Sequence, residues 1–271
     1  MITAAWRALL DLLLPTPCGG CDAVVEPGRG LCAACRAELA RPVPTPELPG
    51  LPPALALAPY AGGPRRAVIA YKERGRRDLA GPLAAALAAA LDQALPRGPC
   101  VLVPAPSRPG AARARGGDHM LRLARAVAAG TEHVVLPALA LSWRARDSVG
   151  LDARERAANL AAHLRVRRRG GPGGAGGRPV VLLDDVLTTG ATARTCAGVL
   201  AAAGLPVDLV LVITAVGARR PVVPGGRPTR TSVTRTGATG SVSIRRAQES
   251  RGVRPTRETP ARHLPATRRS R

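Results

Sequence analysis

The chain has 271 residues, of which 46% are hydrophobic and only 1% aromatic, so its core must be built mainly from Ala, Leu and Val. Its formal net charge of +22 is uneven, because residues 221–271 hold twelve arginines against two glutamates. A basic surface attracts nucleic acids, anionic membranes and phosphorylated small molecules without choosing among them. No run of about 18 uncharged apolar residues occurs, so no membrane span is predicted.

The first seventeen residues contain an apolar run that could belong to a secretory signal. Arg7 and Asp11 interrupt this run, and no small-residue cleavage site follows it. We therefore interpret the segment as a short amphipathic helix of a cytoplasmic protein.

Four of the six cysteines are close together in two CxxC pairs, ten residues apart: Cys18, Cys21, Cys32 and Cys35. Four thiolates form a closed tetrahedral Zn²⁺ site, which is structural because no coordination position remains for a substrate. Disulfides and a redox pair are the alternatives, and the doubled motif without an export signal favours zinc. Residues 1–40 are thus predicted to be a helix followed by a zinc-binding module. Cys100 and Cys196 are expected to be small buried hydrophobic residues.

After a proline-rich segment at 41–53, which we interpret as a linker, strand and helix patterns alternate. Strands are expected at 55–62, 100–106, 133–141, 178–185 and 207–216. Helices are expected at 78–95, 119–130, 151–164 and 189–204. This alternation predicts one α/β domain over 54–218, with a mostly parallel sheet and helices on both faces.

Residues 219–271 are rich in Arg, Thr, Ser, Pro and Gly and lack any apolar periodicity. Such a segment cannot bury enough surface to offset its ordering entropy, so a disordered basic tail is predicted. The tail could bind nucleic acid, although a solvated extension is the interpretation that its composition favours.

An apolar strand runs directly into Asp184 and Asp185, and a helix begins a few residues later. The loop between them places free backbone N–H groups, hydroxyls and a glycine at the carboxyl end of a buried strand, as a phosphate site requires. We expect phosphate binding by the loop residues Leu187, Thr188, Thr189, Gly190, Ala191 and Thr192. The adjacent carboxylates would suit ribose hydroxyls or Mg²⁺. The alternative is a plain strand, turn and N-capped helix.

The run VVLLDDVLTTGAT (180–192) resembles the phosphoribosyl pyrophosphate (PRPP) signature of type I phosphoribosyltransferases. The resemblance implies that the loop holds the 5-phosphate, and that Asp184 and Asp185 contact the ribose hydroxyls. It also implies a second loop, at 104–108, where Ser107 and Arg108 would hold pyrophosphate together with Mg²⁺.

The four-cysteine module followed by this signature resembles the ComF family of competence-associated proteins, over residues 6–218. Segments 60–75, 103–118 and 151–160 agree with it, and they place Lys72 and Arg115 near phosphate. The family often has a glutamine before Arg156 and Asn159, where this chain has DSVGLD. The resemblance implies a role in natural transformation or in handling internalised DNA.

Two functions follow from these patterns. The first is a phosphoribosyltransferase, which holds both phosphates of PRPP while pyrophosphate leaves an oxocarbenium-like ribose. The second is a non-catalytic accessory protein that binds PRPP or a nucleotide and acts on DNA or DNA-processing proteins. The acceptor and the oligomeric state stay open at this point.

Overall fold

The computed structural model describes residues 17–96, 98–107, 109–114, 116–142, 162–167 and 175–220, and the backbone of 231–236 and 241–246. A central sheet is formed by six strands: β1 (Val43–Pro44), β2 (Ala54–Pro59), β3 (Val101–Pro104), β4 (Val134–Val135), β7 (Val180–Leu187) and β8 (Leu209–Ala215). Their order is β1-β2-β8-β7-β3-β4, and only β1 is antiparallel to its neighbour. The chain therefore has the mixed α/β fold and the mostly parallel sheet that the sequence predicts.

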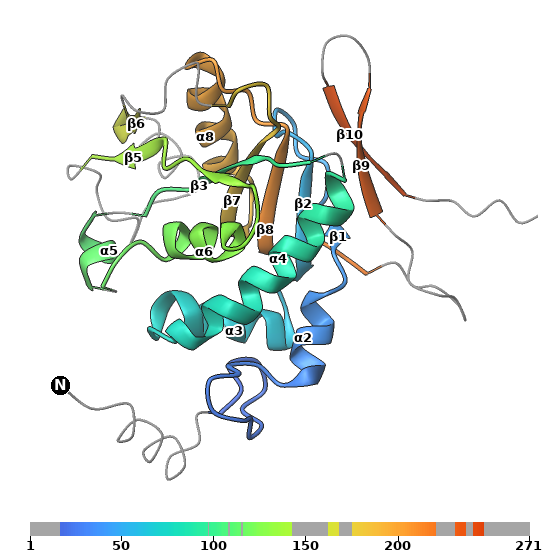
Figure 1. Ribbon diagram of the computed structural model, residues 1–271, viewed down its shortest axis with the longest axis vertical. Coiled ribbons are helices and arrows are strands. Elements are labelled where there is room, and N and C mark those ends of the chain that lie inside the picture. The colour runs from blue at the N-terminus through green and yellow to red at the C-terminus, as the bar shows by residue number, and fades with distance from the viewer. Residues whose placement is uncertain are drawn as a thin grey trace, which may run out of the picture.

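Helices cover both faces of this sheet (Figure 1). They are α2 (Ala33–Leu39), α3 (Gly62–Glu73), the 3₁₀ turn η1 (Arg77–Leu79), α4 (Ala80–Ala94), α5 (Pro109–Ala114), α6 (His119–Ala128) and α8 (Ala191–Ala202). Because side chains alternate along a strand, Val181 and Leu183 of β7 join the core under α3, α4 and α6. Val180 and Leu182 join a second core under α8.

The helix α3 has no counterpart among the elements expected from the sequence. It begins with Gly62, Gly63 and Pro64, a sequence typical of a turn. Proline is tolerated in the first turn of a helix, because the N–H groups there have no partner within the helix. This helix carries Lys72 in its last turn.

The proline-rich segment 41–53 packs against the domain, where the sequence predicts a linker. Val43 is buried, and residues 43–44 form the edge strand β1. An edge strand can contain Pro44 because its outer side needs no hydrogen-bond partner. Two further strands, β5 (Leu139–Leu141) and β6 (Leu164–Val166), pair with each other outside the main sheet.

Part of the basic tail forms an antiparallel pair of strands, β9 (Thr231–Thr236) and β10 (Ser241–Arg246). The sequence predicts no strands in these two segments, because it predicts a disordered tail over 219–271. Their β-branched Thr, Val and Ile residues favour strands, a preference that the overall composition hides. The segments 1–16 and 143–161, in which the sequence predicts helices, lie outside the described residues. Within the described part of the chain, no helix has the length and apolar character needed to span a membrane.

Candidate functional site

The strands β3 and β7 are neighbours whose outgoing connections diverge. From β3 the chain passes through α5 and α6 to β4, whereas from β7 it passes through α8 to β8. The helices α6 and α8 pack on opposite faces of the sheet. In open α/β sheets, ligands bind at such a switch point, outside the carboxyl ends of the strands. Segment 104–107 and loop 188–192 both lie at this point.

The loop after β7 is shaped by Gly190, the N-cap of α8. Its φ of +73° is in the left-handed region, which glycine adopts without steric cost. A Cβ added there would lie 2.8 Å from Leu48 Cδ1, so the backbone is also closely packed. Leu48 belongs to the proline-rich segment 41–53, which therefore contacts the candidate phosphate loop.

This loop presents hydrogen-bond donors that the described part of the protein does not use. Thr188, Thr189 and Thr192 are exposed, and their hydroxyls bond to no described residue. The N–H groups of residues 188–190 likewise donate to no described acceptor. Free N–H groups at the start of a helix, where the helix dipole is positive, form an anion-binding arrangement.

Leu187 differs from the other predicted loop residues. Its side chain is 3% exposed and belongs to the core under α8. Its carbonyl accepts a hydrogen bond from the Val216 N–H. The Leu187 side chain packs against other apolar groups, so a contact of this residue with the ligand would be through its backbone.

Asp185 is the centre of a buried polar cluster. Lys72 Nζ lies 2.8 Å from Asp185 Oδ2, and His119 Nε2 lies 2.9 Å from the same oxygen. Lys72 comes from the end of α3 and His119 from the start of α6, so three elements meet at one carboxylate. The structure thus brings together the predicted residues Lys72 and Asp185.

Ser107 joins this cluster from the other strand end. Its Oγ lies 3.1 Å from His119 Nδ1 and donates at 3.1 Å to Asp118 Oδ1. Asp118 caps α6 by accepting from the Met120 and Leu121 N–H groups, and it also accepts from the Ser107 N–H. His119 therefore links the loop after β3 to the acid of β7.

The two adjacent aspartates have opposite electrostatic environments. Burial acts to raise the pKa of Asp185, but the hydrogen bond from His119 and the charge of Lys72 outweigh it and lower that pKa to about 2. Burial and the neighbouring charge of Asp185 raise the pKa of Asp184 to about 7. Asp185 is thus held as an anion, whereas Asp184 can exchange a proton near neutral pH.

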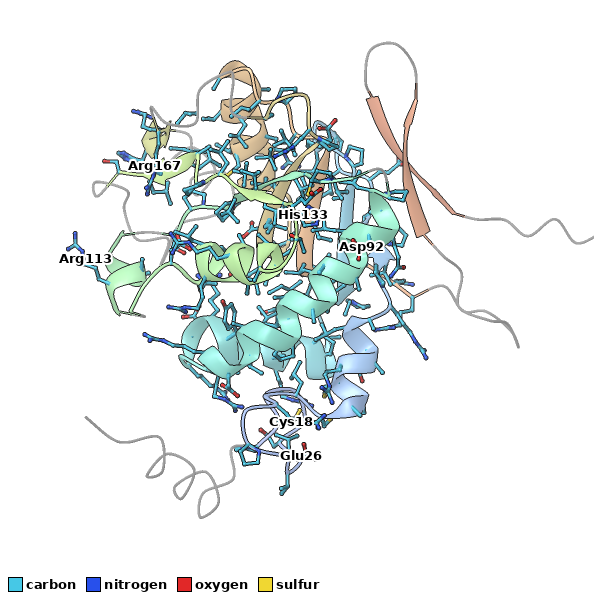
Figure 2. The ribbon with its side chains drawn as sticks, viewed as in Figure 1. Cys18, Glu26, Asp92, Arg113, His133 and Arg167 are labelled. Carbon is cyan, nitrogen blue, oxygen red and sulfur yellow. The ribbon has the colours of Figure 1, made fainter. Side chains whose placement is uncertain are left out.

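Asp184 lies on the opposite face of the sheet, because successive strand side chains alternate. Its charge helps to raise the pKa of Cys196 in α8, after the larger effect of burial. The acids flank the strand end and do not form a single carboxylate pair. Two other predicted residues, Arg108 and Arg115, lie outside the described residues. Between them, Arg113 projects from α5 at the periphery of the molecule (Figure 2).

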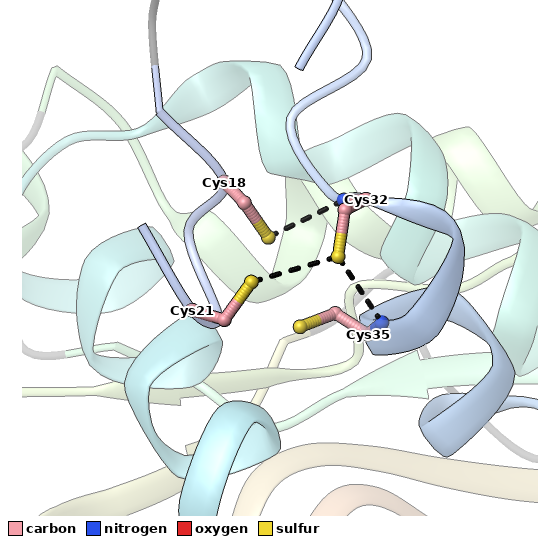
Figure 3. Close-up of side chains that lie close together, drawn as sticks. All are labelled: Cys18, Cys21, Cys32 and Cys35. Atoms are coloured by element: carbon pink, nitrogen blue, oxygen red, sulfur yellow. Dashed lines mark hydrogen bonds between the residues drawn. The ribbon is translucent and has the colours of Figure 1, made fainter. Parts of the chain in front are cut away.

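The second candidate site is the group of four N-terminal cysteines. Their sulfur atoms all lie within 4.8 Å of one another, and Cys21 Sγ and Cys32 Sγ are 3.6 Å apart (Figure 3). Tetrahedral zinc with Zn–S bonds of about 2.3 Å requires sulfur separations of about 3.8 Å. The donor set and its spacing therefore fit one Zn²⁺ ion.

Backbone groups around Cys18 favour its thiolate, whereas burial and the neighbouring cysteines raise the pKa of Cys35. Cys18 Sγ accepts from the N–H groups of Gly20 and Cys32. Burial acts to raise the pKa of Cys18, but these hydrogen bonds lower it to about 6. Gly20 itself leaves no room for a side chain, since an added Cβ would lie 2.6 Å from Cys35 Sγ.

Residues 9–47 match the double zinc ribbon domain. All four cysteines lie in this segment, so it can hold one zinc ion as a closed S₄ site. We call residues 17–40 the zinc ribbon segment from here on. The predicted zinc ligands are confirmed as a four-cysteine zinc-binding site. A comparison of the whole chain with curated proteins finds no match.

Sequence reasoning missed His119 and Asp118. The aspartate before an apolar helical pattern is an N-cap signal, so Asp118 could have been found. No local pattern distinguishes His119 from any histidine in a first helical turn, because its partners Ser107 and Asp185 are distant in sequence.

Proposed function

We propose that this protein binds PRPP, or a related phosphoribosyl ligand, at the switch point between β3 and β7. The observation that carries this proposal is loop 188–192, where three threonine hydroxyls and N–H groups that donate to no described residue surround a left-handed Gly190. A 5-phosphate fits this donor set by charge and by hydrogen bonding. The resemblance of 180–192 to the PRPP signature agrees with it.

In this proposal, the remaining groups of the site contact the sugar and the pyrophosphate. Asp184, partly exposed at the strand end, is available to a ribose hydroxyl. Asp185 holds Lys72 close to the same strand end, where the ammonium adds positive charge for phosphate oxygens. Ser107 lies on the segment that we assign to pyrophosphate.

Magnesium would enter with PRPP and neutralise its phosphate charge. Within the described residues, the cysteine site is the only cluster of three or more metal-ligating side chains. Among these residues, isolated carboxylates such as Asp184 would contact the ion, which suits Mg²⁺, since this ion usually binds through substrate phosphates and one or two carboxylates.

The reaction that we favour is phosphoribosyl transfer to an acceptor of unassigned structure. Loop 188–192 would fix the 5-phosphate, and segment 104–107 would hold the departing pyrophosphate. Positive charge that develops on the ribose would be stabilised by the carboxylates of β7. The pKa of Asp184, raised to about 7, also suits it to proton exchange with a sugar hydroxyl or an acceptor.

Calorimetric titration of the zinc-loaded protein with Mg²⁺-PRPP tests the binding. We expect Thr189→Val to weaken binding about tenfold, since a hydrogen bond to a charged group contributes about 1.5 kcal/mol or more. Thr195→Val is the matched control, because the Thr195 hydroxyl bonds to Ala191 O within α8. No binding by the parent protein, or equal affinities for both variants, would contradict the proposal.

A second function, binding without transfer, is favoured by one observation. Asp185 already accepts from both Lys72 and His119, which limits its capacity for a substrate hydroxyl. The protein would then act as a PRPP-responsive accessory factor in DNA uptake, as the ComF resemblance implies. Pyrophosphate release in the presence of candidate bases and amines would exclude this alternative. Single-stranded DNA binding by the full chain, with a steep salt dependence, would support its DNA-related part.

We also propose a reducing compartment such as the cytoplasm as the place of action. All six cysteines are free, although Cys21 and Cys32 are close together. Zinc thiolates persist where thiols are kept reduced, which supports this location.

A further inference from the structure

We propose that His119 is a positioning residue that ties segment 104–107 to Asp185, by donating one hydrogen bond from each ring nitrogen. This inference rests on the proposed function, because the two parts that it joins are those assigned to pyrophosphate and to ribose. His119 belongs to neither of the two loops that the sequence indicates.

The ring is enclosed by the protein. His119 is 5% exposed, with Nε2 2.9 Å from Asp185 Oδ2 and Nδ1 3.1 Å from Ser107 Oγ. The Tyr71 hydroxyl donates to the His119 carbonyl at 2.8 Å, and the Tyr71 ring packs edge-on against the imidazole. These contacts leave the imidazole in one orientation.

The direction of each hydrogen bond follows from its partners. Ser107 has one hydroxyl proton, which it donates to Asp118, a carboxylate that can only accept. Ser107 Oγ must therefore accept from the Nδ1–H of His119. Asp185 is also an anion, so it accepts from the Nε2–H. The ring therefore donates at both ends.

The charges around the ring stabilise this state. Asp185 of β7 and Asp118 of the α6 cap lie on either side of it. Lys72 of α3 shares Asp185, and Arg122 of α6 bonds to the carbonyl of Gly116. Asp185 and, through Ser107, Asp118 thus provide a hydrogen-bond acceptor at each end of the ring.

The same three residues, Ser107, His119 and Asp185, could be mistaken for a hydrolytic triad. In such a triad the carboxylate contacts Nδ1, and the serine donates to Nε2 as the nucleophile. Here both contacts are reversed, and Asp118 takes the serine proton. The Ser107 hydroxyl is therefore fixed by its hydrogen bonds and is not activated as a nucleophile.

The inferred role is to keep two loops at a fixed separation before the ligand arrives. Segment 104–107 and the end of β7 come from parts of the chain about 80 residues apart, and PRPP would bridge them. A rigid connection between them reduces the ordering cost of binding a ligand that contacts both.

Two isosteric variants separate the two bonds. In His119→Gln, the amide nitrogen can occupy the place of Nε2 and keep the bond to Asp185, whereas in His119→Asn it can occupy the place of Nδ1 and keep the bond to Ser107. The probes are Mg²⁺-PRPP and ribose 5-phosphate, which lacks the pyrophosphate. We expect His119→Gln to weaken PRPP binding about tenfold and to leave ribose 5-phosphate binding unchanged. His119→Asn should weaken binding of both.

A purely structural role predicts a different pattern, in which both variants lose both ligands in parallel with their thermal stability. That result, or parental affinities in both variants, would overturn the inference. Nitrogen-15 NMR of the unliganded parent provides a second measurement that requires no variant to fold. Two protonated ring nitrogens are expected for His119, and a singly protonated ring would overturn the inference. If the parent binds neither probe, the proposed function fails, while the NMR result still decides the state of His119.

Discussion

Asp184 and Asp185 are neighbours in sequence, yet the fold gives them opposite tasks. Asp185 is enclosed with Lys72 and His119, and its pKa is lowered to about 2 despite the opposing effect of burial. Asp184 forms no ion pair with a cation among the residues that the structure describes, and burial and the charge of Asp185 raise its pKa to about 7. Two carboxylates with pKa values moved apart in this way are typical of sites that need one fixed charge and one exchangeable proton.

The raised pKa of Asp184 predicts that this residue destabilises the fold at alkaline pH. Because the folded state holds the proton more tightly than the unfolded state, stability should fall as the pH rises from about 4 through about 7. For a fully buried carboxyl, this change in pKa would correspond to a loss of roughly 4 kcal/mol of folding free energy. We expect about half of this loss for Asp184, because its carboxyl is partly exposed. Asp184→Asn should therefore stabilise the protein by about 2 kcal/mol at pH 8 and by little at pH 5.

Chemical denaturation at both pH values, with zinc present, measures this difference. Asp92→Asn is the matched control, because Asp92 is exposed on α4, and it should change stability little at either pH. A gain for Asp184→Asn that is the same at pH 5 and pH 8 would count against a raised pKa as its cause.

Asp185→Asn should have the opposite effect. The substitution leaves Lys72 and His119 without their shared anion. Loss of one partner of a fully buried charge pair costs about 3–5 kcal/mol, and we expect about 2 kcal/mol here because the Lys72 side chain is 35% exposed. Since the pKa of Asp185 is lowered, this contribution is complete above about pH 4 and disappears as the pH falls toward 2. Denaturation at pH 7 checks the loss, and a variant as stable as its parent would refute the ion-pair assignment.

The sequence was sufficient for the part of the site that is contiguous in it. The acids, the threonines and Gly190 form one run, so their common location follows from local structure. The partners of Asp185 come from α3 and α6, and only the packing of those helices brings them to β7. Long-range contacts of this kind have no local pattern, which is why His119 was missed.

At the scale of secondary structure, the start of α8 is the element on which the phosphate site depends. Its N-cap, Gly190, has a left-handed backbone and faces Leu48. An alanine there would adopt an unfavourable φ and would also displace the leucine side chain. Strain of about 1–2 kcal/mol from φ alone is expected, with a further cost from the contact.

Gly190→Ala should therefore destabilise the protein by about 2–3 kcal/mol and weaken its binding of Mg²⁺-PRPP. Gly198→Ala is the control in the same helix. Gly198 is exposed and has no atom within 4 Å of an added Cβ, so alanine should stabilise α8 by about 0.5–1 kcal/mol. Thermal denaturation measures the change in stability, and calorimetry measures the change in affinity for Mg²⁺-PRPP. Equal effects of the two substitutions would contradict the specific role of Gly190.

Strongly periodic elements could be predicted, and irregular ones could not. The strands β3, β7 and β8 and the helices α4, α6 and α8 lie where apolar patterns place them. The glycines and the proline that begin α3 imitate a turn. Prolines around β1 likewise imitate a linker, although Val43 packs into the core. In both cases tertiary packing outweighs local preference.

At the scale of the whole molecule, the zinc ribbon segment is continuous with the α/β core. Leu31 and Leu39 are buried in the same cluster as Leu79 and Leu83, which precede and begin the apolar face of α4. Arg76 reinforces the junction by donating to the Pro17 carbonyl. The segment therefore does not pack as a separate unit, and the zinc site and the larger domain should unfold together.

Zinc removal should accordingly destabilise the whole chain. Metal binding to a site that forms only in the folded state adds directly to folding free energy, and an effect of about 5 kcal/mol would lower Tm by about 10–20 °C for a chain of this size. Cys21→Ser is the suitable variant, because Cys21 is exposed and its loss removes a ligand without opening a cavity in the core.

Cys196→Ala is the control, since Cys196 is buried in α8 and does not belong to the zinc cluster. Zinc analysis should give one ion per chain for the parent and for Cys196→Ala, and less than one for Cys21→Ser. Circular dichroism should then show one cooperative transition in every case, moved to lower temperature by Cys21→Ser or by a chelator. Leu31, Leu39, Leu79 and Leu83 share one core, so the segment and the domain are expected to unfold in a single transition. A second transition that appears only after zinc loss would contradict this, because it would mean that the segment unfolds separately from the domain.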